Sequence, residues 1–120
     1  MRVLIIDDHA IYRQGMSACL SECEEVGRVT QADSVAEAWS SGLAQECDLV
    51  IVDEDVPGAL EFIRQIRSTA AARAIVCAAS CTQNGVIAAV ESGATGYLSK
   101  DDLTSEQLCA AVSRPAAAGS

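Results

Sequence analysis

Acidic residues stand directly after two short apolar runs of this sequence, where they could do phosphorus chemistry. Asp7 and Asp8 follow the first run, Asp53 follows another with Asp55 two positions on, and Lys100 follows a third near the carboxyl end. Grouped carboxylates repel one another unless a cation lies among them, and Mg²⁺ suits a site with few carboxylates and several retained waters. A carboxylate beside Mg²⁺ and a lysine ammonium can attack phosphorus, because the cations offset the charge that builds on the transferring group.

The elements that must bring these residues together are short strands alternating with amphipathic helices. Apolar runs predict strands over residues 3–6, 28–32, 49–52, 74–77 and 96–98. Helices are expected over residues 11–23, 35–44, around 60–67, around 86–92 and after 104. Capping boxes over residues 34–37 and 104–107 predict the starts of two of these helices, and Gly93 should end the helix around 86–92. Uninterrupted apolar strands separated by helices predict an α/β fold, a doubly wound parallel sheet covered by helices on both faces. Ligands of such a sheet bind at the carboxyl ends of its strands, so the acids and the lysine should meet at one edge.

Composition limits the partners of the chain. Its 120 residues fit one domain, and 17 acidic against 8 basic residues give a formal charge of -9. That charge argues against direct binding to nucleic acid and to anionic membranes. No run approaches the ~20 apolar residues of a membrane helix, and Asp7 comes too early for a signal peptide. We therefore expect a cytoplasmic protein.

The six cysteines are expected to be reduced thiols that fill the core as small apolar residues, because no export signal is seen. They stand at positions 19, 23, 47, 77, 81 and 109. No pair has the Cys-x2-Cys spacing of a zinc site, and the single histidine, His9, is distant in sequence from both closely spaced pairs. For His9 itself, starting the first helix is the favoured role.

Three segments resemble the receiver domain of bacterial two-component response regulators. They are residues 3–9 (VLIIDDH), 48–58 (DLVIVDEDVPG) and 93–101 (GATGYLSKD). The first and the last are most similar to the NarL/FixJ (LuxR-type) branch. The resemblance covers residues 2 to about 113, so we divide the chain into a receiver domain, 1–113, and a linker or frayed tail, 114–120.

The resemblance implies a flavodoxin-like sheet of order 2-1-3-4-5 and a role for each residue of the site. Asp53 would accept the phosphoryl group, and Lys100 would bind it. Tyr97 matches the aromatic switch position. Mg²⁺ would be held by the side chains of Asp7, Asp8 and Asp53 and by the backbone carbonyl of Asp55.

The same resemblance implies partners. The phosphoryl donor would be a sensor histidine kinase, and the protein would be a signalling domain, not an enzyme. A homodimer could form through the expected fourth helix, fifth strand and fifth helix. The output would be transcription regulation by a helix-turn-helix DNA-binding domain, which these residues do not contain.

Two departures from the family pattern affect the expected switch. The family has Thr or Ser at the end of the fourth strand, whereas a gap-free count back from Lys100 reaches Ala78, which cannot donate a hydrogen bond. Ser80 could substitute only if the register shifted. The loop after Asp53 is also about two residues shorter than the family pattern. For Tyr97, constitutive inward packing and ordinary switching both remain open.

Other interpretations stay beside the receiver. Ala78 and the short loop motivate a pseudo-receiver that binds partners without phosphorylation. Asp53-Glu54-Asp55 also matches the Asp-x-Asp signature of haloacid-dehalogenase-type phosphatases, but that motif usually follows the first strand of a larger chain. Acids after strands can also be simple helix caps, and Asp8 alone fits that role.

Overall fold

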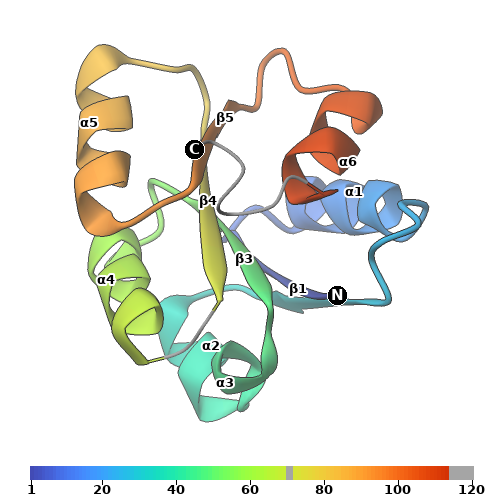
Figure 1. Ribbon diagram of the computed structural model, residues 1–120, viewed down its shortest axis with the longest axis horizontal. Helices are drawn as coiled ribbons and strands as arrows, with labels where there is room; N and C mark the ends of the chain where they lie inside the picture. Colours follow the sequence, from blue (N-terminus) through green and yellow to red (C-terminus); the bar gives the residue numbers. More distant parts are fainter. Residues whose placement is uncertain (70–71, 114–120) are drawn as a thin grey trace.

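A single parallel sheet organises the chain in the computed structural model, which describes residues 1–69 and 72–113 (Figure 1). The sheet has five strands in the order β2-β1-β3-β4-β5, and every pairing is parallel. The order confirms the predicted flavodoxin-like topology. The strands are β1 (Arg2–Ile6), β2 (Arg28–Ala32), β3 (Leu49–Asp53), β4 (Arg73–Ala78) and β5 (Gly96–Ser99).

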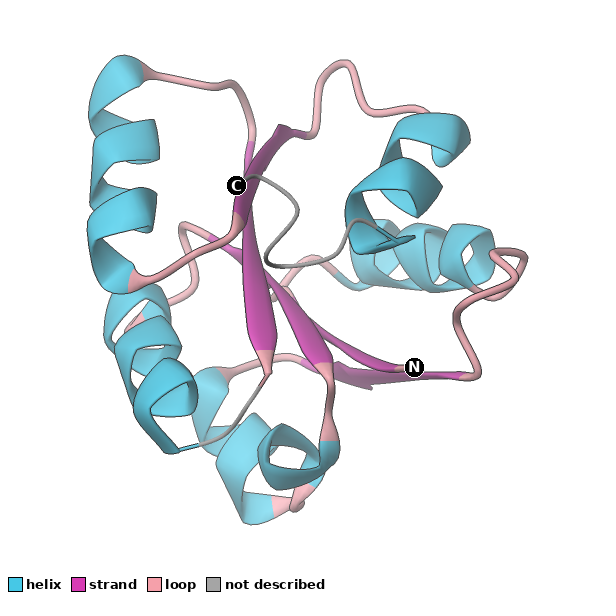
Figure 2. Ribbon diagram, in the orientation of Figure 1, coloured by secondary structure: helices cyan, strands magenta, loops and turns pink. Residues whose placement is uncertain are grey.

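Helices cover both faces of the sheet (Figure 2). One face carries α1 (Ala10–Leu20) and α6 (Ser105–Ser113). The opposite face carries α2 (Val35–Ser40), α3 (Leu43–Glu46), α4 (Ala59–Thr69) and α5 (Gln83–Ser92). Covering both faces explains why the central strands are uninterrupted apolar runs, since successive side chains enter different cores.

Alternate residues of each strand separate into two apolar cores. Leu4 and Ile6 of β1 pack on the α2–α5 side, around Phe62 of α4. Val3 and Ile5 pack on the α1–α6 side. The last four residues of β1, 3–6, and Phe62 are at most 1% exposed, so this part of β1 is fixed from both faces. This burial holds the end of β1, where the acids begin, in a defined place.

Two predicted helices end differently in the structure. The first stops at Leu20, so Cys23 lies beyond it. The predicted helix over 35–44 is two helices, because Gly42 adopts a left-handed conformation (φ 82°) that interrupts the helical hydrogen bonding. Gly93 ends α5 as predicted, also with positive φ. The predicted tail, 114–120, lies outside the described residues.

Both predicted capping boxes begin helices, but only one is reciprocal. At α6, the Thr104 hydroxyl accepts from the amide of Gln107, and the Gln107 side chain accepts from the amide of Thr104. At α2, Ser34 accepts from the amide of Glu37, whereas the Glu37 carboxylate accepts from Asp33. At each of these two starts, the capping side chain thus accepts from one free amide of the first turn.

The expectation of six reduced thiols is wrong for one pair. Cys23 and Cys109 are joined by a disulfide between the segment after α1 and helix α6. The sequence interpretation missed it because 86 positions separate the two residues. Cys47 and Cys77 are buried thiols of the two cores, as predicted.

Among residues 1–69 and 72–113, no helix is both long enough and apolar enough to cross a membrane.

Candidate functional site

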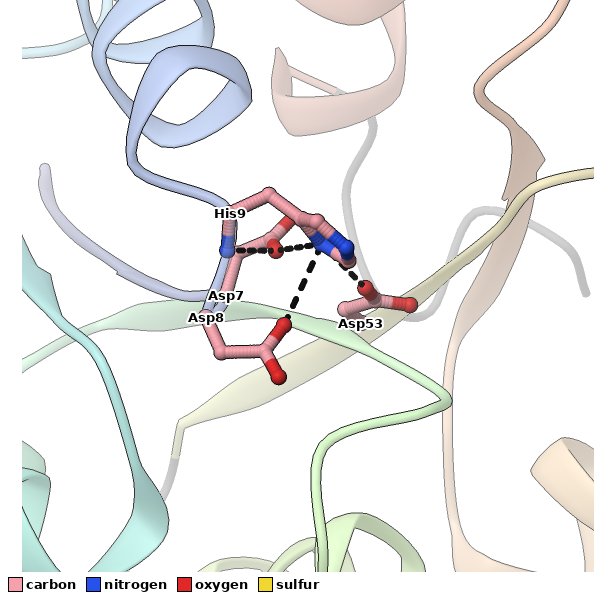
Figure 3. A group of neighbouring side chains, drawn as sticks. All are labelled: Asp7, Asp8, His9 and Asp53. Carbon is pink, nitrogen blue, oxygen red and sulfur yellow. Dashed lines mark hydrogen bonds and ion pairs between the residues drawn. The ribbon is translucent and has the colours of Figure 1, made fainter.

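Three aspartates meet at the carboxyl edge of the central strands (Figure 3). Asp7 follows β1 and Asp53 ends β3, and both are almost fully buried, whereas Asp8 is exposed. One ligand atom from each, together with a nitrogen of His9, lies within 4.8 Å of all the others. The structure therefore brings together the acids that the sequence placed at this edge. We call Asp7, Asp8, His9 and Asp53 the acidic cluster.

Lys100 supplies the cation that this cluster needs. It follows β5, and its Nζ donates to Asp7 Oδ2 at 2.7 Å and to Asp53 Oδ2 at 3.0 Å. The ring of Tyr12 lies 4.3 Å from Nζ, which adds a cation–π contact from α1. The lysine is therefore held beside the ends of β1 and β3 and against α1.

These contacts shift the ionisation of both partners. Burial acts to raise the pKa of Asp7, but hydrogen bonds from Lys100 and His9 outweigh it, and the pKa of Asp7 is lowered. For Lys100, burial acts to lower the pKa, but the bonds to Asp7 and Asp53 outweigh it, and the pKa of Lys100 is raised. The pair is thus charged over the whole physiological range.

His9 is a member of the acidic cluster, and the sequence interpretation did not predict this role for it. Its Nδ1 lies 2.9 Å from Asp7 Oδ1, 3.1 Å from Asp8 Oδ1 and 3.6 Å from Asp53 Oδ2. His9 does precede α1, as predicted, but its side chain makes no capping hydrogen bond. The bond to Asp7 raises the pKa of His9. Adjacency to the two aspartates was the only signal in the sequence, and the fold adds Asp53.

Asp55 stands at the edge of the site. Its side chain is exposed and does not join the clustered ligand atoms of the described residues, while its amide donates to Asp53 Oδ1 at 3.2 Å. An open cavity of about 550 Å³ reaches Asp53 from solvent. It is lined by His9, Ile11, Tyr12, Asp53, Asp55, Ala79, Lys100 and Asp101. Asp53 is therefore reached from solvent although the residue itself is buried.

Ala78 is the last residue of β4, and it is fully buried. It pairs with Ser99 of β5, and its carbonyl accepts from the amide of Lys100 at 2.7 Å. Ser80 lies outside β4 and is exposed. Ala78 therefore ends β4, and Ser80 lies two residues beyond it; that Ala78 holds the switch position stays a prediction.

Tyr97 connects β5 to the loop that follows Asp53. Its hydroxyl donates to Glu54 Oε1 at 2.8 Å, and its half-buried ring packs on the α2–α5 core. Burial, together with the Glu54 bond, raises the pKa of Tyr97 to about 12. Gly85, in the first turn of α5, lies against this hydroxyl, and a Cβ at that position would collide with it. The absence of a side chain at Gly85 is therefore what lets Tyr97 reach Glu54.

Replacing Gly85 with alanine is expected to displace the Tyr97 ring and to lower the free energy of unfolding by about 1 kcal/mol. Urea unfolding and the NMR signals of the Tyr97 ring would measure both effects. The matched control is Gly15→Ala in α1, where no atom lies within 4 Å of the added Cβ. That control should instead stabilise the protein by about 0.5–1 kcal/mol. Equal stabilisation in both variants would contradict the placement of Tyr97.

The sheet order and the acidic cluster with its lysine define a flavodoxin-like α/β domain with an acidic site at the carboxyl edge of its sheet. The chain belongs to the response regulator receiver domain family, whose model matches residues 3–113. It is 30% identical over 118 residues to the nitrate/nitrite response regulator protein NarL of Escherichia coli. The matched region covers 96% of this chain and 54% of that protein. The NarL/FixJ branch predicted from the sequence is thereby confirmed.

Solved structures give the same result. The signal receiver domain of a response regulator NarL from Mycobacterium tuberculosis superposes with a TM-score of 0.82 at 31% identity, covering 92% of this chain and 91% of that one. A response regulator protein from Burkholderia pseudomallei, whose structure has a phosphorylated aspartic acid and a calcium ion, superposes with a TM-score of 0.80 at 25% identity. That match covers 96% of this chain and 68% of the other. The chain spans about half the length of the curated relatives that it matches.

Proposed function

We propose that Asp53 accepts a phosphoryl group from a phosphohistidine of a sensor histidine kinase, in a Mg²⁺-dependent reaction. The observation that carries the proposal is the position of Asp53, which is 3% exposed, 3.0 Å from Lys100 Nζ and beside the carboxylates of Asp7 and Asp8. A related response regulator carries a phosphorylated aspartic acid and a calcium ion in its structure.

The donor atoms of the cluster fit a hard dication. Carboxylate oxygens of Asp7, Asp8 and Asp53 would hold Mg²⁺ together with the backbone carbonyl of Asp55, and waters would complete the shell. When bound, the ion would neutralise charge on the transferring phosphoryl group.

In the transfer, a carboxylate oxygen of Asp53 forms the new bond to phosphorus. The bond from phosphorus to the histidine nitrogen of the kinase breaks, and the imidazole leaves with the electron pair. Lys100 then places its ammonium on a phosphoryl oxygen, as a point charge held by Asp7 and Tyr12. The lysine already touches Asp53, so little reorganisation is needed.

The proposed output surface is formed by α5, β5 and α6. Val86, Ile87 and Val90 of α5 are exposed apolar residues and could contact a second copy in a homodimer. Leu108 of α6 is instead part of the core. We propose that this surface controls a DNA-binding, transcription-regulating domain in the cytoplasm. One curated relative is a DNA-binding transcriptional activator.

Beryllofluoride, which mimics a phosphoryl group on aspartate, tests the proposal. Adding it with Mg²⁺ should shift the backbone amide NMR signals of residues 53–56 and of Lys100, and adding it without Mg²⁺ should leave them unchanged. The shifts in α5 should be smaller than those of residues 53–56, because Ala78 has no hydroxyl that could draw the loop between β4 and α5 toward the ligand. Spectra unchanged with Mg²⁺ would favour the pseudo-receiver, which works without phosphorylation.

A further inference from the structure

Two cysteines distant in sequence meet at the end of α1 that lies away from the acidic cluster. Cys23 follows α1 by three residues, Cys109 lies within α6, and the two sulfurs are bonded. Their Cα atoms are 5.7 Å apart, a separation that unstrained disulfides commonly have. Because α1 has 11 residues, the bond lies about 16 Å along the helix from the cluster. It is therefore a separate feature of the molecule.

The two sulfurs differ in access. Cys23 is 6% exposed and belongs to the α1–α6 core, whereas Cys109 is half-buried at its edge. A small thiol in solution therefore reaches the sulfur of Cys109 more readily than that of Cys23. The difference gives the two cysteines different roles in any exchange reaction.

The bond restrains α6 where it packs on α1. Leu108 and Val112 bury the inner face of α6 against this core. At the end of α6, Arg73 Nη2 donates to the carbonyl of Val112 at 2.8 Å, and the Ser113 hydroxyl donates to Glu25 Oε2 at 3.0 Å. These contacts are noncovalent and survive reduction of the disulfide. Reduction would therefore loosen α6 without unfolding it.

We propose that Cys23 and Cys109 form a reversible thiol–disulfide switch, which fixes α6 on α1 when oxidised and releases it when reduced. The switch does not depend on phosphorylation of Asp53. It acts on α6, the last described helix, and α6 also belongs to the proposed output surface. The redox state of the thiol pool would thus bias the same surface as the phosphoryl group.

The chemistry balances with a small disulfide as oxidant and thiols as reductant. On closing, the Cys109 thiolate attacks the oxidant and releases one thiolate, and Cys23 then attacks the mixed disulfide and releases the second. Two protein thiols lose two electrons and two protons, and one small disulfide becomes two thiols. On opening, one thiolate of a dithiol attacks the sulfur of Cys109, and Cys23 leaves as the thiolate. The second thiol of the dithiol then attacks this mixed disulfide, which releases Cys109 and leaves the reductant as a cyclic disulfide.

Counting free thiols tests the bond. Protein treated with oxidised glutathione, or with dithiothreitol, is unfolded, alkylated with iodoacetamide and weighed by mass spectrometry. We expect four alkyl groups after oxidation, on Cys19, Cys47, Cys77 and Cys81, and six after reduction. Glutathione adducts are recognised by their own mass. Six alkylatable thiols after oxidation would overturn the proposal.

Two serine variants assign the partners. In Cys23→Ser no thiol can resolve the mixed disulfide on Cys109, so we expect four alkyl groups and one glutathione adduct after oxidation, and five alkyl groups after reduction. Cys19→Ser is the matched control, since Cys19 is a free, half-buried cysteine of α1 that lies four residues earlier in the chain. It should give three groups after oxidation and five after reduction. If Cys19→Ser gave the same number of alkyl groups after oxidation and after reduction, Cys19 would belong to the disulfide, and the assignment of Cys23 and Cys109 would be overturned.

Helix α6 reports whether the bond acts as a switch. Oxidation should raise the melting temperature of the wild type by about 10 °C, because the bond closes a long loop, and should leave Cys23→Ser unchanged. Amide hydrogen exchange in α6 should slow about tenfold on oxidation under native conditions. A bond that forms without changing exchange in α6 would overturn the switch and leave the proposed phosphorylation of Asp53 intact.

Discussion

Replacing Asp53 with asparagine is expected to abolish the adduct that wild-type protein forms with acetyl phosphate and Mg²⁺. In the proposed reaction the carboxylate oxygen would be the nucleophile, and an amide oxygen cannot replace it, so the rate should fall by more than about 1000-fold. The measurement is intact-mass analysis for the gain of one phosphoryl group, followed over time. Asparagine has nearly the size of aspartate, so the buried position should stay filled.

The matched control is Asp33→Asn. Asp33 also follows a strand of the sheet, β2, but it is exposed and outside the acidic cluster. This variant should form the adduct at the wild-type rate. An adduct on Asp53→Asn at that rate would place the phosphoryl group on another residue and refute the assignment. No adduct on the wild type would support the pseudo-receiver.

Replacing Lys100 with methionine is expected to lower the free energy of unfolding by about 3 kcal/mol. Its ammonium is bonded to Asp7 and Asp53, and the side chains of both are only 3% exposed. Removing it leaves two neighbouring buried carboxylates without the cation that pairs them. Urea unfolding followed by circular dichroism would measure the loss. The same variant should slow adduct formation by about 100-fold, because the phosphoryl oxygens lose their cation.

A second change separates the charge effect from loss of packing. In Lys100→Met with Asp7→Asn, one carboxylate is neutral and the repulsion is gone, so much of the stability should return. Mg²⁺ should also stabilise Lys100→Met more than the wild type, because it binds between the unpaired carboxylates. If neither treatment restores stability, the lysine contributes through packing and not through charge.

The pH dependence of this deficit has a definite sign. The lowered pKa of Asp7 contributes stability that is present above the unfolded carboxyl pKa and is lost as the pH falls through the folded value. Lys100→Met removes a hydrogen bond that lowers this pKa. In the variant, Asp7 therefore takes up its proton at higher pH, and the deficit relative to wild type should shrink as the pH falls toward about 4. A deficit that is constant between neutral pH and that value would contradict the charge argument.

The amino-acid sequence by itself determined the sheet and most of the site. Apolar runs and capping residues are local signals, and the carboxyl ends of parallel strands share one edge of a sheet. Asp7, Asp8, Asp53 and Lys100 could therefore be placed together although 93 positions separate the first from the last. Only the break at Gly42 and the end of α1 at Leu20 differed materially from the pattern.

The tertiary structure alone decided which side chains meet around that frame. It turned His9 toward Asp53, placed the Tyr97 hydroxyl on Glu54 beside Gly85, and joined Cys23 to Cys109. Each contact depends on how a helix or loop is rotated and packed against a neighbour. Strand periodicity fixes which face of the sheet a residue occupies, but no local pattern fixes the rotation of two helices distant in sequence. That rotation is set by the packing of both cores at once.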